Sequence, residues 1–319
     1  MDDRGFLVTE QLPSSALGLD RLGIREGFDV MQAADGTVAA AVATAREDIC
    51  RAVELVVSAF RRGGRLVYVG AGTSGRLGVL DATECPPTFL TDPSMVQGII
   101  AGGADALVRS VEGAEDRIED GASAIDERNV GPDDVVFGIA TGGTTPFVHG
   151  ALGRARARGA RTVFLACVPK EQVSDSADVS IRVVTGPEVI AGSTRLKAGT
   201  ATKMVLNRVT TLAMVQLGKV YGPLMVDVST RANAKLVDRG IRIVQKVTGL
   251  DRSAAAALLD EADGHVKVAM VMHARQVSGG KARELLDEAE GHIGRILGAA
   301  NVSKCVGVDR LPAAGVEHF

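Results

Sequence analysis

The sequence predicts an α/β protein with a doubly wound parallel sheet and a small C-terminal domain of three helices. Two observations predict this fold class. Short apolar runs typical of buried strands alternate with stretches in which apolar residues recur at helical spacing, and this alternation favours a parallel sheet covered by helices on both faces. After the last strand-like run, the patterns are helical, and the final three are short and separated by glycines.

The N-terminal part is expected to combine an arm and a helix. Residues 1–35 are assigned to an arm, because the polar segment TEQLPSSALGLD is followed by a short apolar-periodic piece. From Thr37 to Arg62, apolar residues recur every three or four positions, and Gly63-Gly64 follows where a helix C-cap belongs. The sequence therefore predicts a long amphipathic helix in this stretch.

The main domain is expected to span residues 36–248 and to hold the sheet. Strands are predicted in five apolar runs, at 65–70, 97–102, 134–140, 161–167 and 179–184. Helical patterns lie at 104–127, 146–158, about 195–217 and within 227–248. The small helical domain is then assigned to 249–298, and residues 299–319 form a tail without a clear pattern.

Composition excludes several functions. A net charge of −3 and 3% aromatic residues without Trp provide neither a basic surface nor stacking platforms for nucleic acid. The N-terminus lacks the features of a secretion signal, and no apolar stretch approaches the roughly 20 residues that cross a bilayer. The cysteines are far apart and the five histidines form no ligand cluster, which predicts a cytoplasmic protein without a metal site.

The segment GAGTSG after the first predicted strand indicates a phosphate-binding loop. Gly72 lets the backbone approach a ligand, Thr73 and Ser74 offer hydroxyl donors, and the following helix N-terminus favours negative charge. A dinucleotide site would need an acidic residue at the end of the next strand, but QGIIAGG ends in glycines. We therefore expect a phosphomonoester here and no nucleotide cofactor.

Two further loops combine glycines with hydroxyl side chains. ATGGTTPF (140–147) contributes Thr141 and Thr145, although its residues also suit an ordinary strand–helix connection. AGSTRLKAGT (191–200) contributes Ser193, Thr194 and Lys197, which add a positive charge to hydroxyls at a helix start. We expect the three loops to converge on one pocket at the carboxyl ends of the strands.

Three segments resemble those of the N-acetylmuramic acid 6-phosphate etherases: GAGTSGRLGVLDATECPPTF, VEGAED and GPEVIAGSTRLKAGTATKMVLN. The resemblance runs from about residue 37 to about residue 298. It implies a sugar-isomerase (phosphosugar-binding) domain, a C-terminal domain similar to ubiquitin-associated domains, and a homodimer. It also implies cleavage of the lactyl ether of N-acetylmuramic acid 6-phosphate to D-lactate and N-acetylglucosamine 6-phosphate during cell-wall recycling.

The resemblance assigns two catalytic glutamates. Glu84 in DATECPP matches the proton-donating residue of the family, and Glu115 in VEGAED matches its second catalytic glutamate. The chemistry needs an acid and a base, since loss of the C2 proton from the ring-opened sugar must accompany departure of the lactate oxygen. The residues themselves leave another interpretation of Glu115 open, because an acidic stripe at helical spacing is usually a solvated helix face.

The second loop departs from the family pattern. It has Gly142 in place of a Ser and Thr144 in place of an Arg, relative to the usual ASGRTP. Loss of one hydroxyl and one guanidinium would weaken sugar-phosphate binding by about 1–3 kcal/mol each if nothing compensates. This change keeps open the alternative of a non-catalytic sugar-phosphate sensor, as in the related glucokinase regulatory proteins. A further alternative is an aldose–ketose phosphosugar isomerase, which would also open the ring and move the C2 proton.

Overall fold

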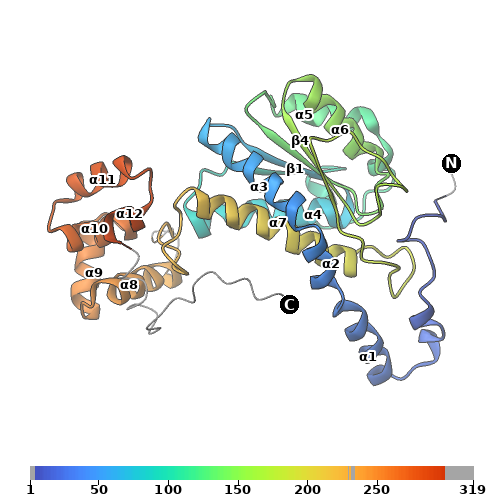
Figure 1. Cartoon of the computed structure of the whole chain (residues 1–319), viewed down its shortest axis with the longest axis horizontal. Coiled ribbons are helices and arrows are strands. Elements are labelled where there is room, and N and C mark those ends of the chain that lie inside the picture. Colours follow the sequence, from blue (N-terminus) through green and yellow to red (C-terminus); the bar gives the residue numbers. More distant parts are fainter. Residues whose placement is uncertain (1–3, 229, 231–233, 299–319) are drawn as a thin grey trace. The chain divides into compact units, whose positions relative to one another are not determined.

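The computed structural model describes residues 4–228, 230 and 234–298 (Figure 1). The chain divides into two compact units. The sheet unit consists of Met1–Glu84 and Asp92–Ala213, and the helical unit consists of Cys85–Thr91 and Met214–Phe319.

The sheet unit is built on five parallel strands: β1 (Leu66–Gly70), β2 (Val96–Ile100), β3 (Val135–Ile139), β4 (Arg161–Ala166) and β5 (Val179–Arg182). Their order is β2-β1-β3-β4-β5, and every neighbouring pair is parallel. The strand order changes direction between β1 and β3, which in open α/β sheets is where ligands bind. The parallel sheet confirms the predicted fold class.

Helices cover both faces of this sheet (Figure 1). On one face, α5 (Ile118–Glu127) and α6 (Pro146–Ala157) pack through a core that includes Val69, Ile125 and Phe147. The other face carries α3 (Arg46–Arg61), α4 (Gly72–Phe89) and α7 (Lys197–Gln216). There Gly78 of α4 lies directly over Tyr68 of β1, so a side chain at Gly78 would meet the Tyr68 Cβ atom at 2.9 Å.

The segment before the sheet holds more helix than expected. Two short 3-10 turns, η1 (Ser14–Ala16) and η2 (Leu19–Arg21), precede α1 (Ile24–Asp35) within the arm. The helix predicted from Thr37 to Arg62 is interrupted at Ala45, where the backbone leaves helical geometry between α2 (Val38–Thr44) and α3.

The prediction of a helix at 104–127 is wrong for the first half of this segment. It contains the 3-10 turns η3 (Ala104–Leu107) and η4 (Ala114–Asp116), and α5 alone is α-helical. Gly103 and Gly113 adopt positive φ angles of 69° and 72°. Such left-handed residues end a right-handed helix, so the acidic periodicity of this segment did not indicate a continuous helix.

The helical unit contains α8 (Ala234–Thr248), α9 (Arg252–Glu261), α10 (Val266–Arg275), α11 (Gly279–Glu288) and α12 (Ile293–Leu297). The three helices predicted at 250–298 correspond to α9, α10 and α11, and α12 adds a short fourth. Asp251 and Ser278 cap α9 and α11 by accepting hydrogen bonds from Ala254 N and Lys281 N. The predicted tail, 299–319, lies outside the described residues.

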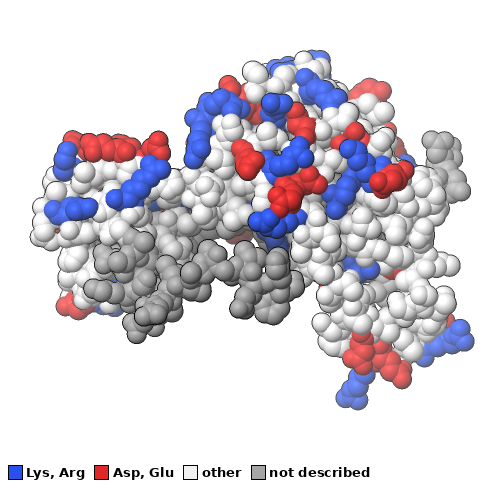
Figure 2. Space-filling view, viewed as in Figure 1, with Lys and Arg blue, Asp and Glu red and all other residues white. Residues whose placement is uncertain are grey.

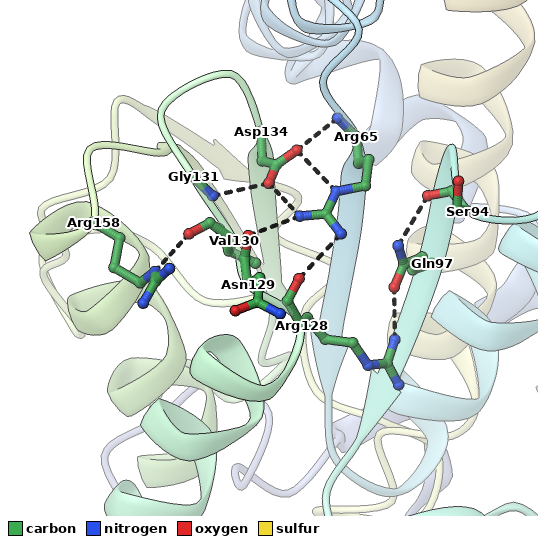
Figure 3. Close-up of polar contacts among 9 residues, drawn as sticks. All are labelled: Arg65, Ser94, Gln97, Arg128, Asn129, Val130, Gly131, Asp134 and Arg158. Carbon is green, nitrogen blue, oxygen red and sulfur yellow. Dashed lines mark hydrogen bonds and ion pairs between the residues drawn. The ribbon is translucent and has the colours of Figure 1, made fainter.

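A polar network joins β1 and β3 at their amino ends (Figure 3). The buried carboxylate of Asp134 accepts hydrogen bonds from Arg65 N and Gly131 N at 2.8 and 2.9 Å and forms a 2.7 Å ion pair with Arg65 Nη2. Burial alone would raise the pKa of Asp134, but the hydrogen bonds from Arg65 and Gly131 hold it below its usual value. The side chains at the amino end of the sheet therefore stabilise the fold. A ligand is expected at the opposite, carboxyl end.

Candidate active site

The first loop is a tight turn between β1 and α4. A side chain at Gly70 would meet Gly75 N at 2.7 Å, and one at Gly75 would meet Ile100 Cγ1 at 2.6 Å. Gly72 adopts φ +52°, and Ser74 is buried in the first turn of α4. The glycines thus let the strand run directly into the helix, so that the helix N-terminus lies at the carboxyl end of β1.

The third loop leads into α7 and contains a buried carboxylate. Glu188 is fully buried and accepts hydrogen bonds from Lys197 N at 3.0 Å and Ala198 N at 2.9 Å. The Lys197 ammonium donates to Thr185 O at 2.7 Å. Glu188 therefore caps the helix start that the sequence suggested for an anion, and the Lys197 ammonium is directed to the backbone.

The first and third loops lie close together. A side chain at Gly199, in the first turn of α7, would lie 3.6 Å from the Thr73 methyl group. Ser193 and Thr194 are half-buried in the bend just before α7. The hydroxyl side chains of these two loops therefore belong to one region.

The second loop is held by backbone hydrogen bonds. Thr141 O accepts from Cys167 N at 2.8 Å, and Gly143 N donates to Ala140 O at 2.8 Å. Gly143 O is bonded to His149 Nε2 at 2.7 Å, so His149 helps to hold this loop. Thr145 is the N-cap residue of α6, but its side chain makes no capping hydrogen bond.

The N-terminal arm reaches the second and third loops, which sequence reasoning did not anticipate. Gly192 N donates to Thr9 O at 2.9 Å, and a side chain at Gly192 would meet the Glu10 carboxylate at 2.7 Å. A side chain at Gly142 would lie 3.9 Å from Thr9 Oγ1. The arm therefore adds a buried hydroxyl and an exposed carboxylate to this region.

Glu115 lies beside the first loop. It is exposed in the turn η4 and lines a cavity of about 170 Å³ together with Gly72 and Arg76. Arg76 is held over this cavity by hydrogen bonds to Leu107 O and Arg109 O, both at 3.2 Å. Because Glu115 occupies the short turn η4, which follows Gly113, it does not belong to the face of a continuous α-helix.

Glu84 lies farther along α4. It lies ten positions after Ser74, which corresponds to about 15 Å along the helix axis. Its side chain is exposed. Within one chain, the structure therefore brings Glu115 to the first loop but leaves Glu84 well beyond it.

Asp81, one turn before Glu84, links α4 to the sheet and to α7. Its buried carboxylate accepts hydrogen bonds from Tyr68 Oη at 2.9 Å and Asn207 Nδ2 at 2.7 Å. Burial raises the pKa of Asp81, against the opposing effect of these hydrogen bonds. This buried contact fixes the helix on which both Ser74 and Glu84 lie.

The two helix starts at the candidate site differ in the charged side chains around them. The first turn of α4 holds no acidic side chain, and Arg76 follows it closely. The start of α7 is flanked by Glu188 and, over Gly192, by Glu10. The carboxylates therefore make the start of α7 less favourable for an anion than the start of α4.

Other features of the described chain bear on cofactors and membranes. Within residues 4–228, 230 and 234–298, no three His, Cys, Asp or Glu side chains are grouped as a metal would require. In the same residues, every helix is too short or too polar to cross a membrane.

The parallel sheet and its glycine-hydroxyl loops define an α/β protein of the sugar-isomerase (SIS) domain class. Residues 117–212 match the SIS domain model, and residues 48–156 match that of the glucokinase regulatory protein N-terminal SIS domain. A putative phosphosugar isomerase involved in capsule formation from Bacteroides fragilis NCTC 9343 shares the fold, with a TM-score of 0.50 and 18% identity over 67% of this chain and 99% of that chain.

Full-length relatives narrow the class to one family. The N-acetylmuramic acid 6-phosphate etherase of Gloeothece citriformis is 56% identical over 273 residues, which are 86% of this chain and 89% of the relative. The etherase of Thermosynechococcus vestitus is 57% identical over 86% of this chain and 88% of its own length. This chain belongs to the N-acetylmuramic acid 6-phosphate etherase family.

Proposed function

We propose that this protein is a carbon–oxygen lyase that cleaves the D-lactyl ether of N-acetylmuramic acid 6-phosphate. Its products are N-acetylglucosamine 6-phosphate and D-lactate, and its role is in the recycling of peptidoglycan amino sugars. The observation that carries the proposal is 56–57% identity to etherases over 86% of the chain. The sensor and isomerase alternatives are not favoured, because this chain matches proteins named etherases over 88–89% of their length.

The reaction requires two proton transfers. Opening of the sugar ring makes C1 an aldehyde, so the proton on C2 becomes acidic. A general base removes that proton, and a general acid protonates the lactate oxygen as the C3–O bond breaks. Water then adds across the double bond of the unsaturated aldehyde, which restores a hydroxyl at C3 and a proton at C2.

The two glutamates are assigned to these steps. Glu115 is the candidate base, and its place in the cavity beside Gly72 supports a position near a sugar whose phosphate is bound at the first loop. Glu84 is the candidate acid, and this assignment comes from its place in the family motif.

We assign different groups of the substrate to different loops, according to the charge around each loop. Gly72, Thr73 and Ser74 bind the phosphate, while Ser193 and Thr194 bind sugar substituents near α7. Thr141 and Thr145 supply second-loop hydroxyls that compensate for the Ser and Arg replaced by Gly142 and Thr144. Lys197 supports the third loop through its bond to Thr185 O instead of contacting the phosphate.

The distance along α4 supports a site shared between two chains. A sugar phosphate bound at Ser74 does not reach a side chain about 15 Å farther along the same helix. We therefore place the site at the boundary of a cytoplasmic homodimer, where Glu84 of a second copy can approach the substrate.

Release of D-lactate from purified protein tests the function. We expect lactate and N-acetylglucosamine 6-phosphate to form in equal amounts from N-acetylmuramic acid 6-phosphate. Unphosphorylated N-acetylmuramic acid is the matched control and should react far more slowly. Absence of lactate, combined with interconversion of aldose and ketose phosphates, would show an isomerase instead.

A further inference from the structure

The cavity beside the first loop holds a cation as well as the candidate base. Arg76 and Glu115 both line this cavity of about 170 Å³. Within the described part of the chain, neither side chain takes part in an ion pair at 4.0 Å or less. A guanidinium and a carboxylate that share a cavity without pairing leave space for a substrate group between them.

The guanidinium of Arg76 is held in place, but only part of it is used. Nε donates to Leu107 O and Nη2 donates to Arg109 O, both at 3.2 Å. Both N–H groups of Nη1 are left without a partner among the described residues. Because the backbone carbonyls already fix the side chain, a ligand that accepts from Nη1 does not have to immobilise it.

The other polar side chains of the cavity are Ser110 and Glu112. Ser110 Oγ donates to Glu112 Oε1 at 2.8 Å, so its hydroxyl proton is already engaged. Of the described lining residues, Arg76 is therefore the one cation and the one side chain with donors left for a ligand. Much of the remaining lining is apolar, which strengthens an interaction between Arg76 and a negative charge; it includes Ala71, Ala101, Ala106 and Val111.

The reaction creates a negative charge next to its base. As Glu115 takes the C2 proton, the electron pair of the C–H bond forms a double bond between C2 and C1, and the C1 oxygen becomes an enolate oxyanion. The C1–O double bond then re-forms, the carbon double bond moves to C2–C3, and the lactate oxygen leaves with the C3–O pair and a proton from Glu84. The C1 oxygen is separated from C2 by C1 alone, so the group that stabilises it must lie beside the base.

The cavity adjoins the phosphate loop without including its hydroxyls. Gly72 lines the cavity, whereas Thr73 and Ser74 are not among its described lining residues. A side chain at Gly72 would meet no atom of another described segment within 4 Å. A sugar whose phosphate is bound at Thr73 and Ser74 can therefore extend past Gly72. Its reacting carbons would then lie between Arg76 and Glu115.

We propose that the Arg76 guanidinium binds the C1 oxygen of the ring-opened sugar and stabilises the enolate formed when Glu115 removes the C2 proton. Arg76 is then a third catalytic residue, which supplies fixed donors where charge develops. This inference rests on the proposed etherase function, because the enolate is an intermediate of that reaction. A role in phosphate binding, or only in holding the backbone of residues 107–109, would affect all ligands of the site alike.

Two stable open-chain analogues distinguish these roles. 2-Acetamido-2-deoxygluconate 6-phosphate has a carboxylate at C1, where the enolate charge develops, and 2-acetamido-2-deoxyglucitol 6-phosphate has a neutral alcohol there. Titration calorimetry measures the Kd of each without turnover. Arg76→Ala should weaken binding of the carboxylate analogue by about 10–100-fold, as expected for a hydrogen bond between charged groups. Binding of the alcohol analogue should stay nearly unchanged.

Arg76→Gln separates the charge from the support of the loop. Gln keeps an N–H donor for the backbone carbonyls but lacks the positive charge, so it should show the same selective loss of the carboxylate analogue. Equal weakening of both analogues would assign Arg76 to the phosphate or to the loop and overturn the proposal. Unchanged binding of both, or a wild type that binds neither, would also overturn it.

The reaction itself provides an independent readout. Arg76→Ala should slow C2 exchange in D₂O and lactate release together by about 10²–10³-fold, mainly in kcat, because the enolate forms only after the substrate is bound. Arg76→Lys should recover part of this loss, since it restores a positive charge without the planar donors. Arg109→Ala is the matched control and should keep wild-type constants, because its side chain is exposed and lies outside the cavity lining.

The kinetic outcomes separate this inference from the etherase function. A loss confined to KM, or C2 exchange at the wild-type rate in Arg76→Ala, would contradict the role of Arg76 while wild-type lactate release still supports the function. Failure of the wild-type protein to release lactate would refute the function itself, and the inference with it.

Discussion

Ser74 combines burial, a hydroxyl group and a place in the first turn of α4. A phosphate there would receive both the hydroxyl and backbone donors of the helix start. We expect Ser74→Ala to raise KM for the phosphorylated sugar by about 10–100-fold, which corresponds to one hydrogen bond to a charged group. Ser193→Ala should also raise KM, but less, because carboxylates flank the third loop. Steady-state kinetics measures both effects, and unchanged constants in both variants would remove these serines from the site.

Residue types and spacing indicated the hydroxyls of the three loops, but they did not indicate the carboxylates around them. The sequence did not indicate the role of Glu188, because its carboxylate reaches the start of α7 only after the segment before the helix has folded back over it. Asp81 was hidden for a similar reason, since Tyr68 and Asn207 meet it from distant parts of the chain. Such tertiary partners leave no local pattern in the sequence.

At the scale of elements, β1 and β3 depend on the ion pair between Arg65 and Asp134. We expect Asp134→Asn to lower the free energy of unfolding by about 2–4 kcal/mol near neutral pH, because a buried, hydrogen-bonded charge is lost. The native carboxylate has a lowered pKa, so its stabilising effect is present above the ordinary pKa of about 4 and is lost as pH falls through the lower folded value.

Denaturant titrations at several pH values measure this effect. The difference between wild type and Asp134→Asn should be largest near pH 7 and should shrink steadily below pH 4. Asp133→Asn is the control, because its ion pair with Arg62 is largely exposed and should contribute less than about 1 kcal/mol. A difference that does not change with pH would mean that Asp134 acts through packing and not through its charge.

The elements also show where periodicity is informative. All five strands lie within two residues of their predicted positions, because continuous apolar runs follow from burial on both faces of a sheet. The region 104–116 was assigned wrongly, since Gly113 at positive φ interrupts the helical pattern. That same interruption places Glu115 in the cavity beside the first loop.

At the scale of the whole molecule, catalysis by glutamates predicts independence from metal ions and nucleotides. We expect dialysis against a chelator to leave the rate of lactate release unchanged within about twofold, because proton transfer by carboxylates needs no Lewis acid. Reconstitution with Mg²⁺, Zn²⁺ or Mn²⁺ is the control. Loss of activity that one of these ions restores would contradict the proposed mechanism.

The arm and the helical unit show the limits of sequence reasoning at this scale. The polar TEQLP segment indicated an arm, but its contact with Gly192 depends on the folded positions of both loops. Within residues 250–298, the sequence predicted helices correctly at α9, α10 and α11, because glycines separate three strongly periodic segments. The domain boundary at residue 249 stays a prediction, and the compact helical unit also includes α8.

The central claim is that two glutamates carry out two separable proton transfers, and proton NMR in D₂O tests it most directly. Exchange of the C2 proton of N-acetylmuramic acid 6-phosphate and release of lactate are followed together in Glu84→Ala and Glu115→Ala. Glu84→Ala should exchange the C2 proton but release almost no lactate, whereas Glu115→Ala should lose both reactions by about 10²–10⁴-fold. Both variants should keep wild-type melting temperatures, because both side chains are exposed. Exchange in Glu115→Ala with none in Glu84→Ala would reverse the roles, and wild-type lactate release by either variant would contradict the claim.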